Sequence, residues 1–329
     1  MRSRRSVISG IVTFGLLFLT ALALWQRQNI FDWYRLRGYV PSAEVAALAA
    51  NTTMSDKARR IFYVYRPELN DRAQFSSHCP NNGEKTIVLG CYINPVGIYL
   101  FDVTDERLKG IEEVTAAHET LHAAYDRLSS SEKARIDKLL NDAFSKISDK
   151  RLVDTIESYK KAGADISNEL HSILGTEVRN LPPELEEYYA RYFTNRVTIV
   201  EYSEKYEKVF SDRKAQADSY LKQLSDIESQ LAAIRQSTDA MEAELNSQYK
   251  ELQQERNRFD ATSQSAVNAY NTKVNAYNNQ VAVYKTRIQT YNQLVEEHNQ
   301  ILEKYNAIAL EENELIKAID SRVPAVSNQ

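Results

Sequence analysis

The last part of the chain lacks the two residues that most often interrupt helices. The sequence holds nine glycines and seven prolines, yet neither residue occurs between Pro183 and Pro324. Because glycine and proline are the strongest local breakers of helices, a stretch of this length without them permits very long helices. The sequence therefore predicts an extended α-helical region over about residues 201–320, followed by a short tail at 321–329.

The second half of this region carries a heptad repeat. Apolar residues recur every seven positions, and a second series, mostly tyrosine, follows three residues after each of them. This 3–4 alternation is typical of the seam of a coiled coil. The first series is Val267, Val274, Val281, Ile288, Val295, Leu302 and Ala309, and the second is Tyr270, Tyr277, Tyr284, Tyr291, His298 and Tyr305.

The first half of the region repeats the alternation from Leu224 to Leu245 and loses it near residues 252–267. Residues 259–265 lack strong apolar positions. Two arms of similar length around a weak centre favour an antiparallel hairpin, with arms of about 80 Å each. A continuous rod that dimerises along its length and contains a stutter is the alternative.

The N-terminus predicts export. Residues 6–25 contain no charged side chain and follow Arg2, Arg4 and Arg5. Twenty helical residues rise about 30 Å, the thickness of a bilayer core, and the preceding arginines favour a cytoplasmic N-terminus. We therefore expect residues 1–25 to form a transmembrane anchor of a single-pass membrane protein, with the rest of the chain outside the cytoplasm. A cleaved signal peptide is the alternative, because residues 21–23 read Ala-Leu-Ala.

Two cysteines, Cys79 and Cys91, are present. In an oxidising compartment they favour a disulfide that closes a short loop, and otherwise they are two free thiols. Their spacing excludes a CxxC zinc knuckle.

Short runs rich in β-branched and aromatic residues indicate strands at residues 61–65, 86–92 and 97–103. Helical patterns follow from Asp105, and Ser129 with Glu132 forms a capping box at the start of one of them. The sequence therefore predicts an α+β fold, in which a small antiparallel or mixed sheet packs on helices.

The chemistry lies in the sequence His118-Glu119-Thr120-Leu121-His122, an HExxH motif. Residues four apart share one face of a helix, so His118 and His122 can bind one Zn²⁺ together. Glu119 is then placed to act as a general base toward a water molecule that attacks a peptide carbonyl. The alternative without a function is a pair of surface histidines on an amphipathic helix.

Other classes of function are disfavoured. A net charge of −4 argues against a nucleic-acid-binding protein, which usually presents a basic face. No GxxxxGK[ST] sequence is present, so no ATPase is indicated.

The HExxH motif and the acidic helix after it resemble the zincin metallopeptidases, and in particular their glutamate-ligand branch, the gluzincins. The resemblance covers residues 57–200 and implies a mixed sheet packed on the HExxH helix, with residues 97–103 as an edge strand that receives a peptide. It also implies a third zinc ligand from a later helix. Asn168-Glu169 and Ser172 match the NExxS part of that helix, which makes Glu169 the ligand; Glu177 is the alternative and His171 a third choice.

Zincins often stabilise the developing oxyanion with a tyrosine, histidine or arginine. The segment after Pro183 offers several such side chains, for which core packing is the competing interpretation. They are Tyr188, Tyr189, Arg191, Tyr192 and Arg196.

Together these observations divide the chain into an anchor (1–25), a juxtamembrane connector (26–56), a zincin-like domain (57–200), a coiled coil (201–320) and a tail. The expected function is zinc-dependent hydrolysis of peptide bonds in an extracytoplasmic protein or peptide. A homo-oligomer or another envelope protein is the partner expected for the coiled coil. The rival hypothesis is a non-enzymatic, membrane-anchored coiled-coil scaffold of the cell envelope.

Overall fold

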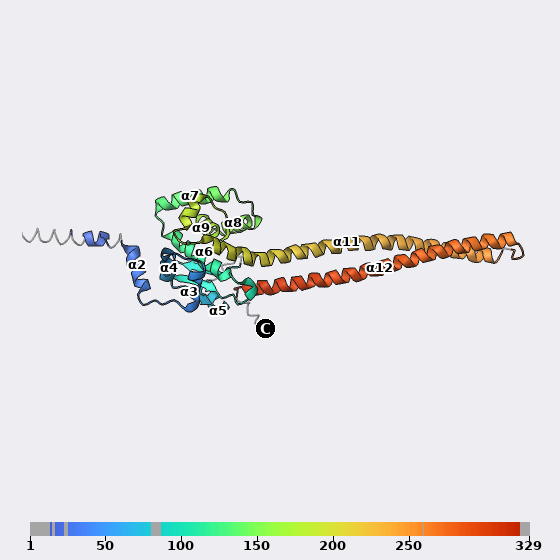
Figure 1. Cartoon of the computed structure of the whole chain (residues 1–329), viewed down its shortest axis with the longest axis horizontal. Helices are drawn as coiled ribbons and strands as arrows, with labels where there is room; N and C mark the ends of the chain where they lie inside the picture. Colours follow the sequence, from blue (N-terminus) through green and yellow to red (C-terminus); the bar gives the residue numbers. More distant parts are fainter. Residues whose placement is uncertain (1–13, 15–16, 23–25, 80–86, 259, 323–329) are drawn as a thin grey trace, which may run out of the picture. The chain divides into compact units, whose positions relative to one another are not determined.

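The computed structural model describes residues 14, 17–22, 26–79, 87–258 and 260–322 (Figure 1). The chain divides into two compact units. The first contains Met1–Val209 and Leu315–Gln329, and the second contains Phe210–Glu314. The predicted combination of a small mixed sheet with many helices, two of them very long, is confirmed.

The sheet of the first unit has three strands in the order β1-β3-β2. They are β1 (Glu68–Asn70), β2 (Gly90–Ile93) and β3 (Gly97–Phe101). β1 runs parallel to β3, and β2 runs antiparallel to it. The strand expected at the edge, 97–103, is therefore the central one, and all five residues of β3 are buried. β2 occupies the edge instead.

The strand predicted at residues 61–65 is wrong, because this segment belongs to helix α4 (Asp56–Val64). Ser55 caps the helix by accepting a hydrogen bond from the Ala58 backbone N–H. Ala58, Ile61, Phe62 and Tyr65 are all buried, and their spacing places them on one helical face. Helical periodicity against the core thus outweighs the β propensity of the aromatic and β-branched residues.

Helix α6 (Ile111–Asp126), which carries the HExxH motif, lies at the centre of the first unit. Helix α9 (Ile166–Glu177) packs directly against it. A Cβ atom on Gly175 would lie 2.4 Å from Leu121 Cδ1, so the two helices approach more closely than any larger residue permits. Other helices surround this pair: α2 (Arg27–Leu36), α3 (Ala43–Asn51), α5 (Arg72–His78), α7 (Ser130–Phe144), α8 (Lys150–Ala162) and α10 (Pro183–Tyr189).

Local signals in the sequence account for two further features of this unit. The capping box predicted at Ser129 and Glu132 is present at the start of α7. The predicted disulfide between Cys79 and Cys91 is also confirmed, and it joins the end of α5 to β2.

Arg196 caps the C-terminal end of α9 from inside the protein. Its side chain is only 3% exposed and pairs with Glu186. Its guanidinium donates to the backbone carbonyls of Val178 at 2.7 Å and Arg179 at 2.9 Å. It also donates to the Leu174 and Gly175 carbonyls, in the last turn of α9, at 3.4 Å each. The last carbonyls of a helix have no partner within the helix, so a forked donor at this point stabilises the end of α9.

The end of the chain contributes to the same unit. Leu315 and Ser321 are buried. The Ser321 hydroxyl donates to the Val88 carbonyl at 2.6 Å, and the Arg72 guanidinium donates to the Lys317 carbonyl at 2.9 Å. The segment that leads into β2 is therefore held by residues more than two hundred positions further along the chain.

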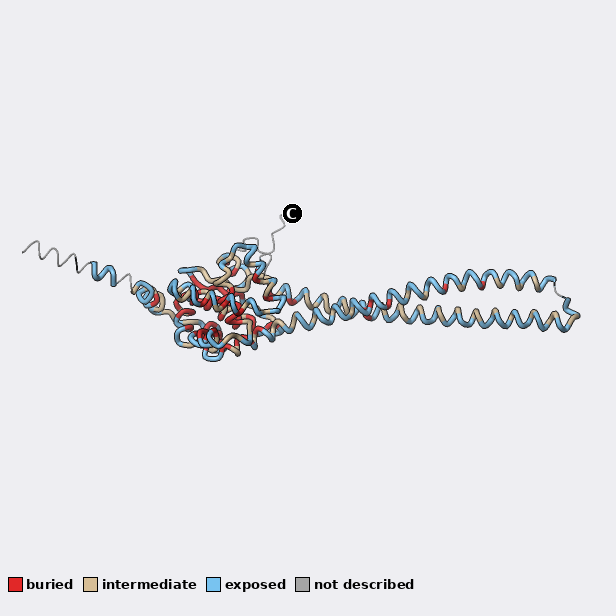
Figure 2. Tube along the Cα trace, turned by 90° about the horizontal axis from the view of Figure 1, so that it is seen from above, coloured by how far each residue is buried: buried red, intermediate tan, exposed pale blue. Residues whose placement is uncertain are grey.

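In the second unit, the long helices α11 (Arg196–Arg256) and α12 (Gln264–Ile319) run antiparallel as a hairpin. Leu224 and Ile227 of α11 pack against Ile301 of α12. Nearer the tip, Lys273 pairs with Glu255 at 2.7 Å. Most hairpin residues are exposed or half-buried, as expected for two helices with a single shared seam (Figure 2).

The expected single-pass membrane location is corrected by the structure. Most of residues 6–25 lie outside the described part of the chain. Among the described residues, no helix has both the length and the apolar character needed to cross a bilayer. A spanning helix needs about 20 mostly apolar residues. Helix α2 has 10 residues and carries Arg27, Asp32 and Arg35.

The cap on α9 predicts a stability effect. We expect Arg196→Lys to lower the free energy of unfolding by about 2 kcal/mol, because an ammonium group cannot replace the fork and leaves buried carbonyls without a donor. Arg191→Lys, at a side chain that is 44% exposed, is the matched control and should change stability by less than about 0.5 kcal/mol. Urea unfolding followed by circular dichroism measures both, and equal effects would contradict this role of Arg196.

Candidate metal centre

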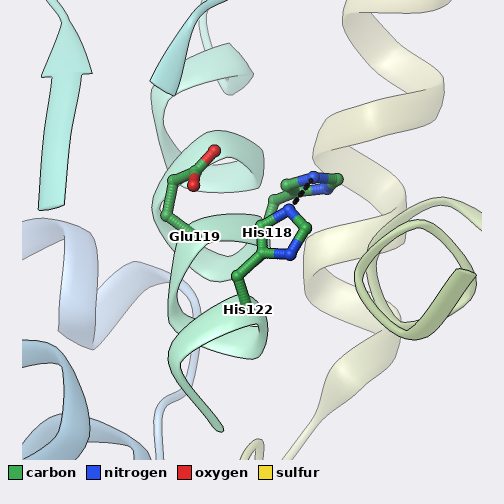
Figure 3. A group of neighbouring side chains, drawn as sticks. All are labelled: His118, Glu119 and His122. Atoms are coloured by element: carbon green, nitrogen blue, oxygen red, sulfur yellow. Dashed lines mark hydrogen bonds between the residues drawn. The ribbon is translucent and has the colours of Figure 1, made fainter. Parts of the chain in front are cut away.

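The two histidines of the motif converge on one point. Helix α6 places His118 and His122 one turn apart, and their Nε2 atoms lie 3.0 Å from each other (Figure 3). Ligand atoms of His118, Glu119 and His122 all lie within 4.8 Å of one another. The helical spacing read from the sequence therefore produces the convergence that a shared metal ion requires.

His122 is oriented by a residue of α9. Its Nδ1 lies 3.0 Å from the Asn168 side-chain oxygen, which can only accept, so Nδ1 carries the proton and Nε2 keeps its lone pair. Burial lowers the pKa of both His118 and His122, which favours neutral imidazoles. Sequence reasoning did not assign Asn168 this role, although it directly precedes Glu169 in the NExxS match.

Among the candidates for a third ligand, Glu169 approaches the histidines. One of its carboxylate oxygens lies 3.8 Å from His122 Nε2. Glu177 lines the same cleft but forms an ion pair with Arg151 at 2.7 Å. His171 is completely buried, and its Nε2 bonds to the Tyr188 hydroxyl at 2.8 Å. Glu169 is thus the carboxylate that the structure brings to the histidine pair.

Glu119 is a buried carboxyl group against the edge strand. Burial, with a smaller contribution from the charge of Glu169, raises its pKa to about 8, while a hydrogen bond from the Tyr92 backbone N–H acts in the opposite direction. A Cβ atom on Gly90 would lie 2.8 Å from the Glu119 side chain, so β2 passes at a distance that only glycine allows. Gly90 was not singled out from the sequence.

These groups line an open cleft of about 490 Å³. One wall is formed by residues leading into and along β2, and the others by α6, α8 and α9. The two imidazoles converge, Glu119 belongs to the same group, and the Glu169 carboxylate lies 3.8 Å from His122 Nε2. Two histidines and a carboxylate are a donor set that fits a catalytic zinc site, which uses three protein ligands and leaves a position open. The residues present therefore fit Zn²⁺.

The residues suggested for oxyanion stabilisation lie elsewhere. Tyr188, Tyr189 and Tyr192 are core residues, each at most 2% exposed. Arg196 caps α9, and Arg191 lies near Glu132 on the surface. The tyrosines that line the cleft are instead Tyr92, Tyr159 and Tyr206. No motif marks these tyrosines in the sequence, because three different elements bring them together.

No family model, curated protein or solved structure matches this chain. The geometry of the cleft is therefore the basis for a function.

The raised pKa of Glu119 predicts a pH-dependent stability of the metal-free protein. An unfolded glutamate ionises near 4.5, whereas the folded one keeps its proton up to about 8, so the folded state loses stability as pH rises across this interval. Glu119→Gln removes this loss. We expect its melting temperature, relative to the wild type, to be higher near pH 8 than near pH 5 in the presence of a chelator.

Glu157→Gln provides the matched control, because the Glu157 side chain is 63% exposed. The melting temperature of this variant should differ from that of the wild type by the same amount at both pH values. A Glu119→Gln difference that does not change with pH would contradict a proton on Glu119.

Proposed function

We propose that this protein is a zinc-dependent peptidase that hydrolyses peptide bonds of a protein or peptide substrate. The observation that carries the proposal is the convergence of His118, Glu119 and His122 in an open cleft, with the Glu169 carboxylate 3.8 Å from His122. A surface histidine pair would have neither the orienting contact from Asn168 nor a buried carboxyl neighbour.

Each residue of the cleft has a separate role in the proposed hydrolysis. His118, His122 and Glu169 would hold the zinc ion, which when bound lowers the pKa of water and polarises a carbonyl group. Asn168 keeps His122 in the tautomer that directs Nε2 toward the metal. Glu119, as a carboxylate, accepts a proton from the attacking water and delivers it to the leaving amine. Tyr159 and Tyr206 line the cleft, and the hydroxyl of either one would be the donor to the oxyanion.

The edge strand gives the cleft a surface for an extended peptide. Within the described residues, β2 pairs with β3 on one side only, and its residues line the cleft. An exposed strand edge offers backbone donors and acceptors that a peptide can satisfy in any sequence, which suits a peptidase. Ile87, Val88 and Leu89 extend this wall with apolar side chains.

The proposed ligands predict the metal content. The purified chain should bind about one zinc per molecule, and the double substitution His118→Ala, His122→Ala should abolish binding. Glu169→Gln should weaken zinc binding strongly, whereas Glu177→Gln, in the same cleft but paired with Arg151, should leave it nearly unchanged. Elemental analysis and competition with a chelator measure these effects. A folded wild type that takes up no zinc when it is supplied would refute the zinc site.

The proposed general base predicts the activity. Glu119→Gln should retain zinc but cleave an unfolded protein substrate at least about 100-fold more slowly than the wild type. Mass spectrometry of the fragments identifies the bonds cleaved, and Glu157→Gln serves as the control. Zinc-loaded wild type without cleavage of any substrate, or equal cleavage by Glu119→Gln, would contradict the peptidase and favour the scaffold.

A further inference from the structure

The seam of the hairpin follows the predicted repeat on α11 throughout. Apolar or small residues at alternating spacings of three and four face the partner helix. Leu224, Ile227, Thr238 and Leu245 are buried, and the intervening positions are half-buried. The alternation continues past Leu245 through Leu252, beyond the point where the sequence pattern weakens.

On α12 the seam departs from the predicted repeat. As far as Tyr284, the half-buried positions include Val267, Val274 and Val281 together with the tyrosines. After Tyr284, the residue directly before each member of the Val267 series becomes the covered one. Leu294, before Val295, is half-buried, and Ile301, before Leu302, is only 6% exposed. Val281, Tyr284 and Arg287 are half-buried at two successive spacings of three, so the repeat shifts by one residue, as a three-residue insertion into a heptad pattern does.

This shift leaves part of the predicted apolar series outside the hairpin. Ile288 is 36% exposed and Leu302 is 38% exposed, although both continue the series of Val267, and Val295 between them is half-buried. These three residues, which we call the outer ridge, are seven positions apart and therefore lie along one line on α12. Large aliphatic residues held in such a line toward solvent are typical of a second helix-packing surface.

Three asparagines lie beside the outer ridge. Asn292, Asn299 and Asn306 follow its members by four positions each and are all exposed. Amide side chains beside a seam can form hydrogen bonds across it, and they repel no partner.

The first part of α12 is basic and the second part is acidic. Residues 264–295 contain Lys273, Lys285 and Arg287 and no acidic residue. Residues 296–314 are predominantly acidic, with Glu296 and Glu303 directly after two members of the outer ridge and Lys304 as the single cation. A parallel copy of this helix would place like charges together, whereas an antiparallel copy would place the basic half beside the acidic half.

We propose that the outer ridge packs antiparallel against the outer ridge of a second copy of this chain, with the two-fold axis near Val295. Ile288 of one copy then meets Leu302 of the other, because the two lie equally far from Val295. Lys285 of each copy comes near Glu303 of the other. A second copy supplies the same heptad period and the complementary charge, so the surface is self-complementary, as a two-fold interface must be.

Sedimentation analysis of the full chain over a range of concentrations tests the interface. The wild type should be dimeric, and Ile288→Glu or Leu302→Glu should raise the dimer dissociation constant by about tenfold or more. Val283→Glu is the matched control, because Val283 is 47% exposed on α12 but lies off the outer ridge, and it should dimerise as the wild type does. Circular dichroism shows that each variant keeps its helices.

A charge swap and cross-linking test the orientation. Lys285→Glu and Glu303→Lys should each weaken the dimer, and the double variant should restore it. A mixture of Ile288→Cys and Leu302→Cys chains should form mixed cross-links, whereas a parallel dimer would link each variant to itself. A wild type that stays monomeric at all concentrations, or a Val283→Glu variant as defective as Ile288→Glu, would overturn the proposal.

Discussion

The site depends on one close helix contact, between α6 and α9. Gly175 allows α9 to approach Leu121 on α6, and Arg196 donates to carbonyls in the last turn of α9 and directly after it. This packing brings Asn168 and Glu169 to His122, although neither residue is near it in the sequence. Without this contact, α6 would present two histidines and no carboxylate ligand from α9.

Burial also sets the charge state of the cleft. Desolvation favours the neutral forms of His118, His122 and Glu119. The metal-free cleft therefore carries less charge than its ionisable side chains would have in water. Neutral imidazoles are already in the form that binds a metal cation, so no proton has to leave them. Glu119 differs, because a nearby positive charge would be needed to favour its ionised form. In the proposed peptidase, metal binding would therefore also ionise the general base.

Periodicity predicted the long helices, and helical spacing predicted the approach of His118 and His122, because both depend on residues close in sequence. The sheet was predicted less well: residues 61–65 have strand-like side chains but a helical burial pattern that only the core reveals. Asn168, Gly90 and the tyrosines of the cleft escaped prediction for a similar reason. Their roles depend on contacts between distant elements, which no local pattern records. On α12, the heptad predicted a seam, but two successive spacings of three around Tyr284 shift the covered positions by one residue.

The hydrogen bond from Ser321 to Val88 has a consequence for how the protein is made. Val88 belongs to the cleft wall, and its anchor lies at the far end of the second long helix. A ribosome must therefore translate both arms of the hairpin before this wall acquires its final support. The nascent chain carries the complete HExxH helix long before it carries a complete cleft, which delays assembly of the site until both arms have been synthesised.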